Sequence, residues 1–104
     1  MTERLFTWSP VKEQKNLRKH GIGFDEARRV FLDPLHVSVQ DRIEEGEVRW
    51  QTIGMAGGVL LLLVAHTMTD DEDEAGRPVE IIHIISARAA TRAERRRYEQ
   101  GDEG

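Results

Sequence analysis

The order of hydrophobic and polar residues predicts four β-strands, over residues 35–40, 47–55, 59–66 and 79–87. The first two alternate between apolar and polar side chains, which is the period of a strand with one buried face. The other two are apolar at most positions, as in strands covered on both sides. Leu35 is expected to point inward in the first strand. We expect charged loops at 41–46 and 68–78, and the short links favour an antiparallel sheet.

Helices are predicted by their start and stop signals, over residues 10–20, 25–32 and 91–98. Ser9 suits an N-cap, Pro10 the first helical position, and Gly21 the residue after a helix end. Thr91 and Glu94 form a T-x-x-E capping box. Together the elements predict one α+β domain over residues 1–104, in which a four-stranded antiparallel sheet carries two N-terminal helices and a C-terminal helix. We expect the polar tail, residues 101–104, to fray.

Composition narrows the class of protein. The absence of cysteine excludes disulfides, thiolate metal sites and a cysteine nucleophile. The longest aliphatic run, residues 59–65, is shorter than the roughly 20 residues that span a bilayer. The first residues contain no apolar stretch of signal-peptide length. We therefore expect a soluble, cytoplasmic protein without membrane contact.

The net charge of −4 is unevenly distributed. Residues 34–76 hold two Lys or Arg against nine acids, whereas the two ends of the chain are mildly basic. Basic side chains gather where the last strand meets the last helix, at Arg88, Arg92, Arg95, Arg96 and Arg97, followed by Tyr98. The overall charge therefore describes this junction poorly, and the junction is the first place to look for chemistry.

RNA cleavage without a metal would suit such a junction. It needs a group that takes the 2′-hydroxyl proton, a group that protonates the leaving 5′-oxygen, and fixed cations for the charge on phosphorus. Arg88 suits the last role because a guanidinium binds phosphate oxygens in a bidentate manner. His20 or Tyr98 could exchange protons. The alternative interpretation is that the other arginines form a solvated helix face and Tyr98 is a packing residue.

No cofactor or metal is expected. The four histidines have no H-x-x-H or H-E-x-x-H spacing, and the chain contains no P-loop, G-x-G-x-x-G or G-x-S-x-G motif. The acidic run Asp70–Glu74 lacks the ligand spacing and central glycine of a calcium loop.

A resemblance covers residues 5 to 99 and is carried by six motifs in order: F-T-W-S-P-V-K, N-L-R-K-H-G-I-G-F-D-E-A, V-F-L-D-P, E-V-R-W-Q-T-I-G, L-L-L-V-A-H-T and I-I-S-A-R-A-A-T-R-A-E-R-R-R-Y. Together they resemble the BrnT family of toxins from bacterial type II toxin–antitoxin systems. The resemblance implies a RelE-like fold and a metal-independent endoribonuclease that inhibits translation. The motif residues carried over by position are Lys19, His20, Glu26, Arg49, His66, Arg88 and Tyr98.

The resemblance also implies a partner. A cognate BrnA-type antitoxin would sequester the toxin and would carry the segment that binds operator DNA, so that the complex represses its own operon. A dimer, or a heterotetramer with the antitoxin, is compatible with this arrangement.

Several family positions have lost a basic residue. Met55, His83 and Ala89 stand where the family often carries one, and a long acidic loop follows the H-T motif. Losing cations weakens binding to a phosphate backbone.

The leading hypothesis is an endoribonuclease that produces a 2′,3′-cyclic phosphate, with RNA as its substrate. The assigned catalytic residues are His20 for proton transfer, Arg88 and Arg49 as phosphate clamps, and Tyr98 and Lys19 in support; the assigned RNA-binding residues are Arg92, Arg95, Arg96 and His66. The alternative is a BrnT-like protein with little or no nuclease activity that binds the antitoxin for operon autoregulation.

Overall fold

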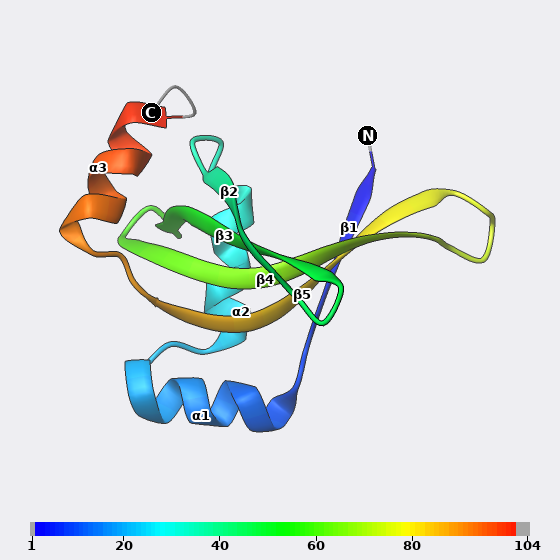
Figure 1. Cartoon of the computed structure of the whole chain (residues 1–104), viewed down its shortest axis with the longest axis horizontal. Helices are drawn as coiled ribbons and strands as arrows, with labels where there is room; N and C mark the ends of the chain where they lie inside the picture. The colour runs from blue at the N-terminus through cyan, green and yellow to red at the C-terminus, as the bar shows by residue number, and fades with distance from the viewer. Residues whose placement is uncertain (1, 102–104) are drawn as a thin grey trace.

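Five strands form one mixed sheet in the order β1-β5-β4-β3-β2 in the computed structural model, which describes residues 2–101 (Figure 1). Their bounds are β1 Glu3–Trp8, β2 Val37–Glu44, β3 Glu47–Ala56, β4 Leu60–Glu72 and β5 Pro78–Ala89. Strands β2 to β5 are antiparallel neighbours, whereas β1 pairs with β5 in parallel. The fold is α+β, but the predicted four-stranded antiparallel sheet is wrong.

The missed strand, β1, lies in a segment where the sequence predicted no regular element. Its pairing runs from Glu3 opposite Val79 to Trp8 opposite Ile84, across almost the whole chain. A parallel pair cannot be closed by a short turn, so no hairpin signal marks it. The strand is also a half-exposed edge, which gives only faint alternation.

The helices are α1 Pro10–His20, α2 Phe24–Ala27 and α3 Arg92–Gln100, with a 3₁₀ segment, η1, at Arg28–Leu32. The predicted second helix is therefore one α turn followed by a 3₁₀ turn. This segment packs closely on β3, since a Cβ at Gly54 would lie 2.8 Å from Cγ1 of Val30. The capping predictions are confirmed, because the Ser9 hydroxyl accepts from the amide of Lys12 and both bonds of the Thr91–Glu94 box are present.

The helices α2 and η1 cover one face of the sheet and complete the main core. This core contains the apolar residues Ile22, Phe24, Ala27, Val30, Phe31, Ala56, Leu62, Val64, Ile82, Ile84 and Ala87. A smaller cluster of Ile53, Leu61 and Leu63 lies on the opposite face, which we call the open face, and Tyr98 of α3 packs against it. Leu35, predicted to point inward, is 66% exposed because β2 begins only at Val37.

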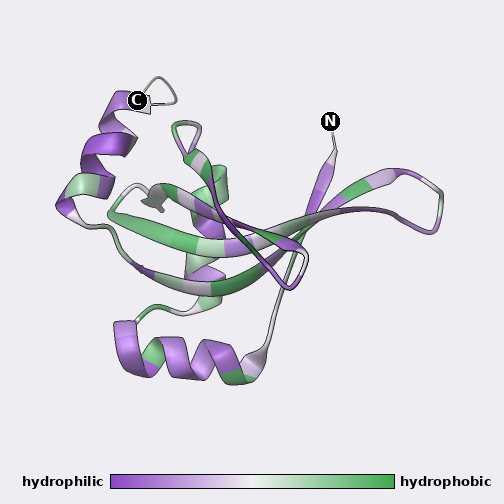
Figure 2. Cartoon of the chain, in the orientation of Figure 1, coloured by the Kyte–Doolittle hydropathy of each residue, from purple (hydrophilic) through white to green (hydrophobic). Residues whose placement is uncertain are grey.

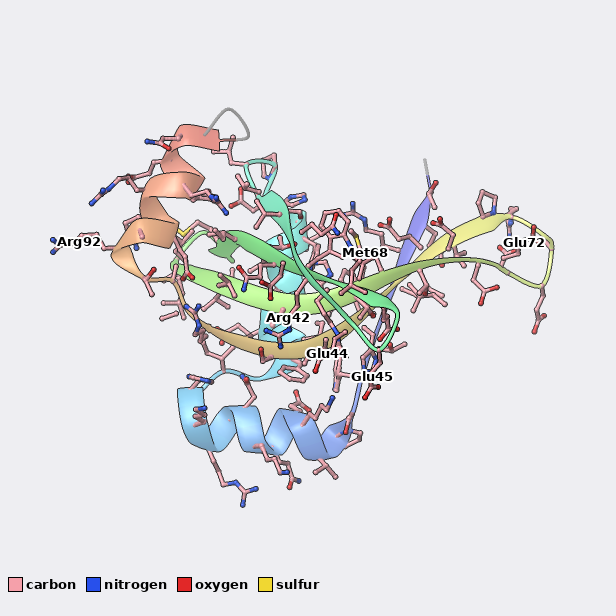
Figure 3. The ribbon with its side chains drawn as sticks, viewed as in Figure 1. Arg42, Glu44, Glu45, Met68, Glu72 and Arg92 are labelled. Atoms are coloured by element: carbon pink, nitrogen blue, oxygen red, sulfur yellow. The ribbon has the colours of Figure 1, made fainter. Side chains whose placement is uncertain are left out.

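Both predicted charged loops are mostly strand. The β2 strand continues to Glu44 and turns at Glu45 and Gly46, which have φ values of 53° and 79°. Likewise, β4 continues to Glu72, near the tip of a hairpin that projects from the sheet (Figures 1 and 3). The polar side chains indicate that these segments are exposed to solvent. The hydrogen bonds between the strands nevertheless continue where neither face of the hairpin packs on the core.

Figure 2 shows hydrophilic residues over most of α1 and α3. Among residues 2–101, no helix has the length and apolar character needed to cross a membrane. The predicted frayed tail lies largely outside the described residues, at 102–104, while Gly101 follows α3 as its C-cap.

Candidate functional site

A groove of about 490 Å³ separates α1 from the end of β5. It is lined by Lys12, Lys15, Asn16, Lys19, His20, Ile85, Ser86 and Arg88. Within the described part of the chain, none of these lining residues is acidic. The groove therefore joins three of the residues assigned from the sequence, Lys19, His20 and Arg88, and adds two lysines that the sequence interpretation did not single out.

The helix α1 supplies the groove with a polar stripe. Lys12, Lys15, Asn16, Lys19 and His20 follow the spacing i, i+3, i+4, i+7 and i+8, which places them on one helical face. That spacing usually carries the apolar residues that bury a helix. Here it carries cations, and this unusual stripe was the sequence signal that could have found Lys12 and Lys15.

Asn16 fixes α1 to β5 beside Arg88. Strand β1 ends opposite Ile84, so the outer edge of β5 has no strand partner beyond that point. There the buried side-chain amide of Asn16 replaces a strand partner. Its Oδ1 accepts from the backbone N–H of Ala87 at 3.0 Å, and its Nδ2 donates to the Ala87 carbonyl at 2.8 Å. Nδ2 also donates to the carbonyl of Ile22 at 2.8 Å. The helix α1 that carries these cations is thereby held at a fixed position relative to Arg88.

Arg88 is paired with a carboxylate of α3. Its two terminal nitrogens donate to the two oxygens of Glu94 at 2.7 and 2.8 Å, in a bidentate arrangement. The hydrogen bonds to Glu94 raise the pKa of Arg88, and the same bonds lower the pKa of the Glu94 carboxyl. Because Glu94 also caps α3, the helix start and the guanidinium are oriented together. Glu94 was known from the sequence only as a cap.

Arg49 shares the open face with Arg88 but lies at a distance from it. Arg88 pairs with Leu63 of β4, and Leu63 pairs with Ile53 of β3. Arg49 precedes Ile53 by four residues on the same strand, so its side chain is on the same face. Strands about 4.8 Å apart with a rise of about 3.4 Å per residue put the two Cα atoms roughly 17 Å apart. Arg49 therefore does not line the groove that contains Arg88.

The surroundings of Arg49 are a charged cluster at the β2–β3 hairpin. Its guanidinium lies 3.9 Å from Glu44 and 3.8 Å from Glu47, and Arg42 is its partner across the strands. Figure 3 shows Arg42 and Glu44 on this hairpin. Among residues 2–101, the buried Nε of Arg49 has no hydrogen-bond partner.

Tyr98 lies outside the groove. Its hydroxyl donates to Oδ2 of Asp33 at 2.7 Å, and that bond raises the tyrosine pKa to about 12. The amides of Met55 and Leu35 donate to the same carboxylate. Burial raises the pKa of Asp33, but these three hydrogen bonds outweigh burial and keep the pKa below its ordinary value. Tyr98 therefore fastens α3 to the sheet.

The assigned RNA-binding residues have different settings. Arg92, Arg95 and Arg96 are exposed on α3, and Arg92 points away from the sheet in Figure 3. His66, in contrast, is 0% exposed, and its Nε2 is 2.6 Å from the Thr52 hydroxyl. Its ring packs edge-on against Phe31. His66 is thus a core residue and offers no surface to RNA in this fold.

Burial lowers the pKa of His66 from 6.5 to about 4. Between these values the unfolded chain binds more protons than the folded one, so acid favours unfolding. We expect the free energy of unfolding to fall by about 3 kcal/mol as the pH drops from 6.5 towards 4, from the size of this shift. Urea unfolding across this range measures the change. A His66→Gln variant should lose most of the slope between these pH values, and an equal slope in the variant would contradict the assignment.

The three positions with lost basic residues have ordinary structural surroundings. His83 is on the open face, with Nδ1 2.9 Å from the Thr7 hydroxyl of β1. Met55 packs beside the Ile53 cluster, and Ala89 ends β5 exposed to solvent.

Within residues 2–101, no three His, Asp or Glu side chains come together as a metal site would require.

Comparisons with known proteins identify the fold and the family of the chain. The solved structure of the ribonuclease toxin BrnT from Brucella abortus superposes with a TM-score of 0.54 and 19% identity, over 88% of this chain and all of that one. No curated protein matches the sequence. The sequence model of the family described as "Ribonuclease toxin, BrnT, of type II toxin-antitoxin system" matches residues 8–94, a span that includes α1, the whole antiparallel part of the sheet, Arg88 and Glu94. The chain therefore belongs to the BrnT family of ribonuclease toxins.

Proposed function

We propose that the chain cleaves RNA without a metal, by attack of a 2′-hydroxyl on the adjacent phosphate. The new bond joins O2′ to phosphorus and the bond from phosphorus to O5′ breaks, which leaves a 2′,3′-cyclic phosphate and a 5′-hydroxyl. The observation that carries this proposal is the groove, where a histidine, three lysines and Arg88 line one cavity. Cations held in place before the reaction stabilise the charge that develops on phosphorus.

Three of the groove residues have a proposed role in the reaction. His20 takes the proton from O2′ or delivers one to O5′, since an imidazole ring can both accept and donate a proton. Arg88 clamps the phosphate at the reaction centre, and Lys19 adds positive charge beside His20. Arg49 and the exposed α3 arginines, Arg92, Arg95 and Arg96, contact RNA on either side of the scissile bond.

The remaining parts of the proposal concern its biological setting. RNA cleavage inhibits translation in the cytoplasm, and a cognate BrnA-type antitoxin neutralises the toxin. The antitoxin provides the contact with operator DNA. Membership of a type II toxin–antitoxin family supports a protein partner of this kind.

The test is RNA cleavage by the purified chain in EDTA, on an all-ribose substrate and on one with a 2′-deoxy block at the cut site. We expect cleavage that survives EDTA and stops at the block. Cleavage that needs an added divalent metal, or that proceeds past the block, would contradict the mechanism.

The alternative is an antitoxin-binding protein with little nuclease activity. The bidentate Glu94 pair favours it, because a phosphate must compete with a carboxylate for Arg88. The absence of cleavage on both substrates, together with free growth when the chain is expressed alone, would establish this alternative.

A further inference from the structure

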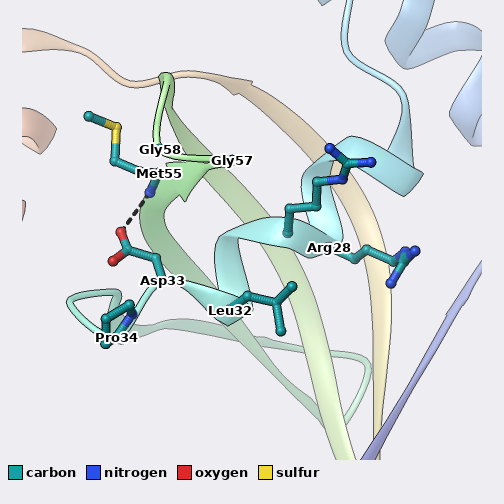
Figure 4. Close-up of a pocket in the computed structure, with 8 residues that line it drawn as sticks. Arg28, Leu32, Asp33, Pro34, Met55, Gly57 and Gly58 are labelled. Atoms are coloured by element: carbon teal, nitrogen blue, oxygen red, sulfur yellow. Dashed lines mark hydrogen bonds between the residues drawn. The ribbon is translucent and has the colours of Figure 1, made fainter.

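A second hollow, which we call the apolar pocket, lies between η1 and the turn from β3 to β4 (Figure 4). It measures about 480 Å³. Leu32, Pro34 and Met55 supply apolar walls, and Gly57 and Gly58 leave the turn side open. The apolar pocket shares no lining residue with the groove.

Exposed aliphatic residues line the apolar pocket or lie within two residues of its lining in sequence. Leu32 is 76% exposed, Leu35 66%, Val59 85% and Leu60 39%. Half of the eight large hydrophobic residues that the described chain exposes therefore line this hollow or lie within two residues of its lining in sequence. An apolar surface gathered in this way marks a binding site for another macromolecule.

Positive charge borders the apolar pocket on two sides. Arg28 and Arg29 line its η1 side, while the arginine-rich α3 approaches its other side through the Tyr98–Asp33 bond. Asp33 is the acidic residue in the lining, and its oxygens already accept from Tyr98, Met55 and Leu35. The rim therefore favours an occupant that is apolar at its centre and acidic at its edges.

Such an occupant is a protein segment and not RNA. Single-stranded RNA is bound by aromatic rings on which its bases stack, together with cations. Among residues 2–101, no aromatic ring lines the apolar pocket. An amphipathic helix, in contrast, places aliphatic side chains in a hydrophobic groove through one face and keeps carboxylates on its flanks.

We propose that the apolar pocket, with the surrounding Leu32, Leu35, Val59 and Leu60, is the docking site for an acidic amphipathic segment of the antitoxin. This inference rests on the antitoxin partner in the proposed function. Aliphatic side chains of the segment enter the pocket, and its carboxylates pair with Arg29 and with the arginines of α3. The occupant also contacts Asp33. This carboxylate accepts the hydrogen bond from Tyr98 that fastens α3, and Glu94 of the same helix holds Arg88. Antitoxin contact therefore begins away from the groove and reaches the helix that borders it.

The test compares two matched double variants, with the purified cognate antitoxin as the probe. The first, Leu32→Ser with Val59→Ser, removes one exposed leucine and one exposed valine beside the apolar pocket. The control, Leu17→Ser with Val11→Ser, removes the same residue types from two exposed positions of α1. We expect calorimetry to give at least about tenfold weaker antitoxin binding for the first variant and a change within about twofold for the control. Far-ultraviolet circular dichroism checks that both variants are folded.

Several results would overturn the inference. Unchanged antitoxin binding by the folded first variant would exclude this surface while leaving the proposed partner intact. Failure of the unsubstituted chain to bind the antitoxin would reject both the partner and its docking site. Loss of RNA cleavage by the first variant, with intact antitoxin binding, would assign the surface to RNA. A change in the mass of the assembly that the chain forms in solution without antitoxin would assign the surface to contact between two copies.

Discussion

Arg88→Ala is expected to lower the rate of RNA cleavage by at least about 100-fold, the scale seen when one fixed charge-stabilising donor is removed from an active site. Arg88 is the residue that joins the β5 end of the groove to α3, and its head group is held by two hydrogen bonds to Glu94. Its removal takes away the proposed phosphate clamp without opening a cavity in the core. Initial rates on a short RNA measure the effect.

Arg4→Ala is the matched control. Arg4 is also a half-exposed strand arginine bound to a carboxylate, with its Nε 2.8 Å from Glu80, but it lies over Phe31 on the opposite face of the sheet. Its removal should leave cleavage unchanged. Arg88→Lys should recover only part of the lost rate, because a single ammonium cannot reproduce bidentate binding. A folded Arg88→Ala protein with full activity would remove Arg88 from the mechanism.

Asn16→Ala is expected to destabilise the fold by about 4 kcal/mol, since it breaks three buried hydrogen bonds and leaves backbone groups of Ala87 and Ile22 unpaired. Urea unfolding measures this loss. Gln14→Ala, at an exposed position of the same helix, is the control and should change stability by less than about 0.5 kcal/mol.

The same substitution should impair cleavage even where the protein remains folded. Asn16 connects α1 to the residue next to Arg88, so its loss frees His20 and Lys19 to move relative to the phosphate clamp. We expect the rate to fall under conditions where circular dichroism still shows the native spectrum. An Asn16→Ala protein with native stability would contradict the role that we assign to this side chain in fixing α1 to β5.

Local signals predicted the local structure well. The Ser9 cap, the Gly21 stop and the Thr91–Glu94 box are short-range hydrogen-bonding patterns, and each appears where the sequence placed it. The strand β1 depends instead on a partner more than seventy residues away, which no window of neighbouring residues contains. The prediction of charged loops where β2 and β4 continue was wrong for a related reason. Side-chain polarity there reflects solvent exposure, while the backbone remains paired.

The residues that line the candidate site were predicted only in part, again because some of them depend on contacts between distant segments. Arg88 and His20 stood out by their chemistry and do line one groove. Asn16 did not stand out, because an amide that replaces a missing strand partner can be recognised only when the strand is known to end at Ile84. His66 was carried over from the family motif at the predicted end of a strand, whereas β4 continues past it and its buried ring packs against Phe31.

The pairing of β1 with β5 makes the order of assembly differ from the order of synthesis. Strand β1 and helix α1 leave the ribosome before their partners, β5 and the backbone of Ala87, which follow more than seventy residues later in the chain. Contacts between such distant segments form late, because the intervening chain must be closed into a loop first. A nascent or truncated chain that stops before β5 carries the lysines of α1 without Arg88. A complete groove therefore exists only after β5 has been made.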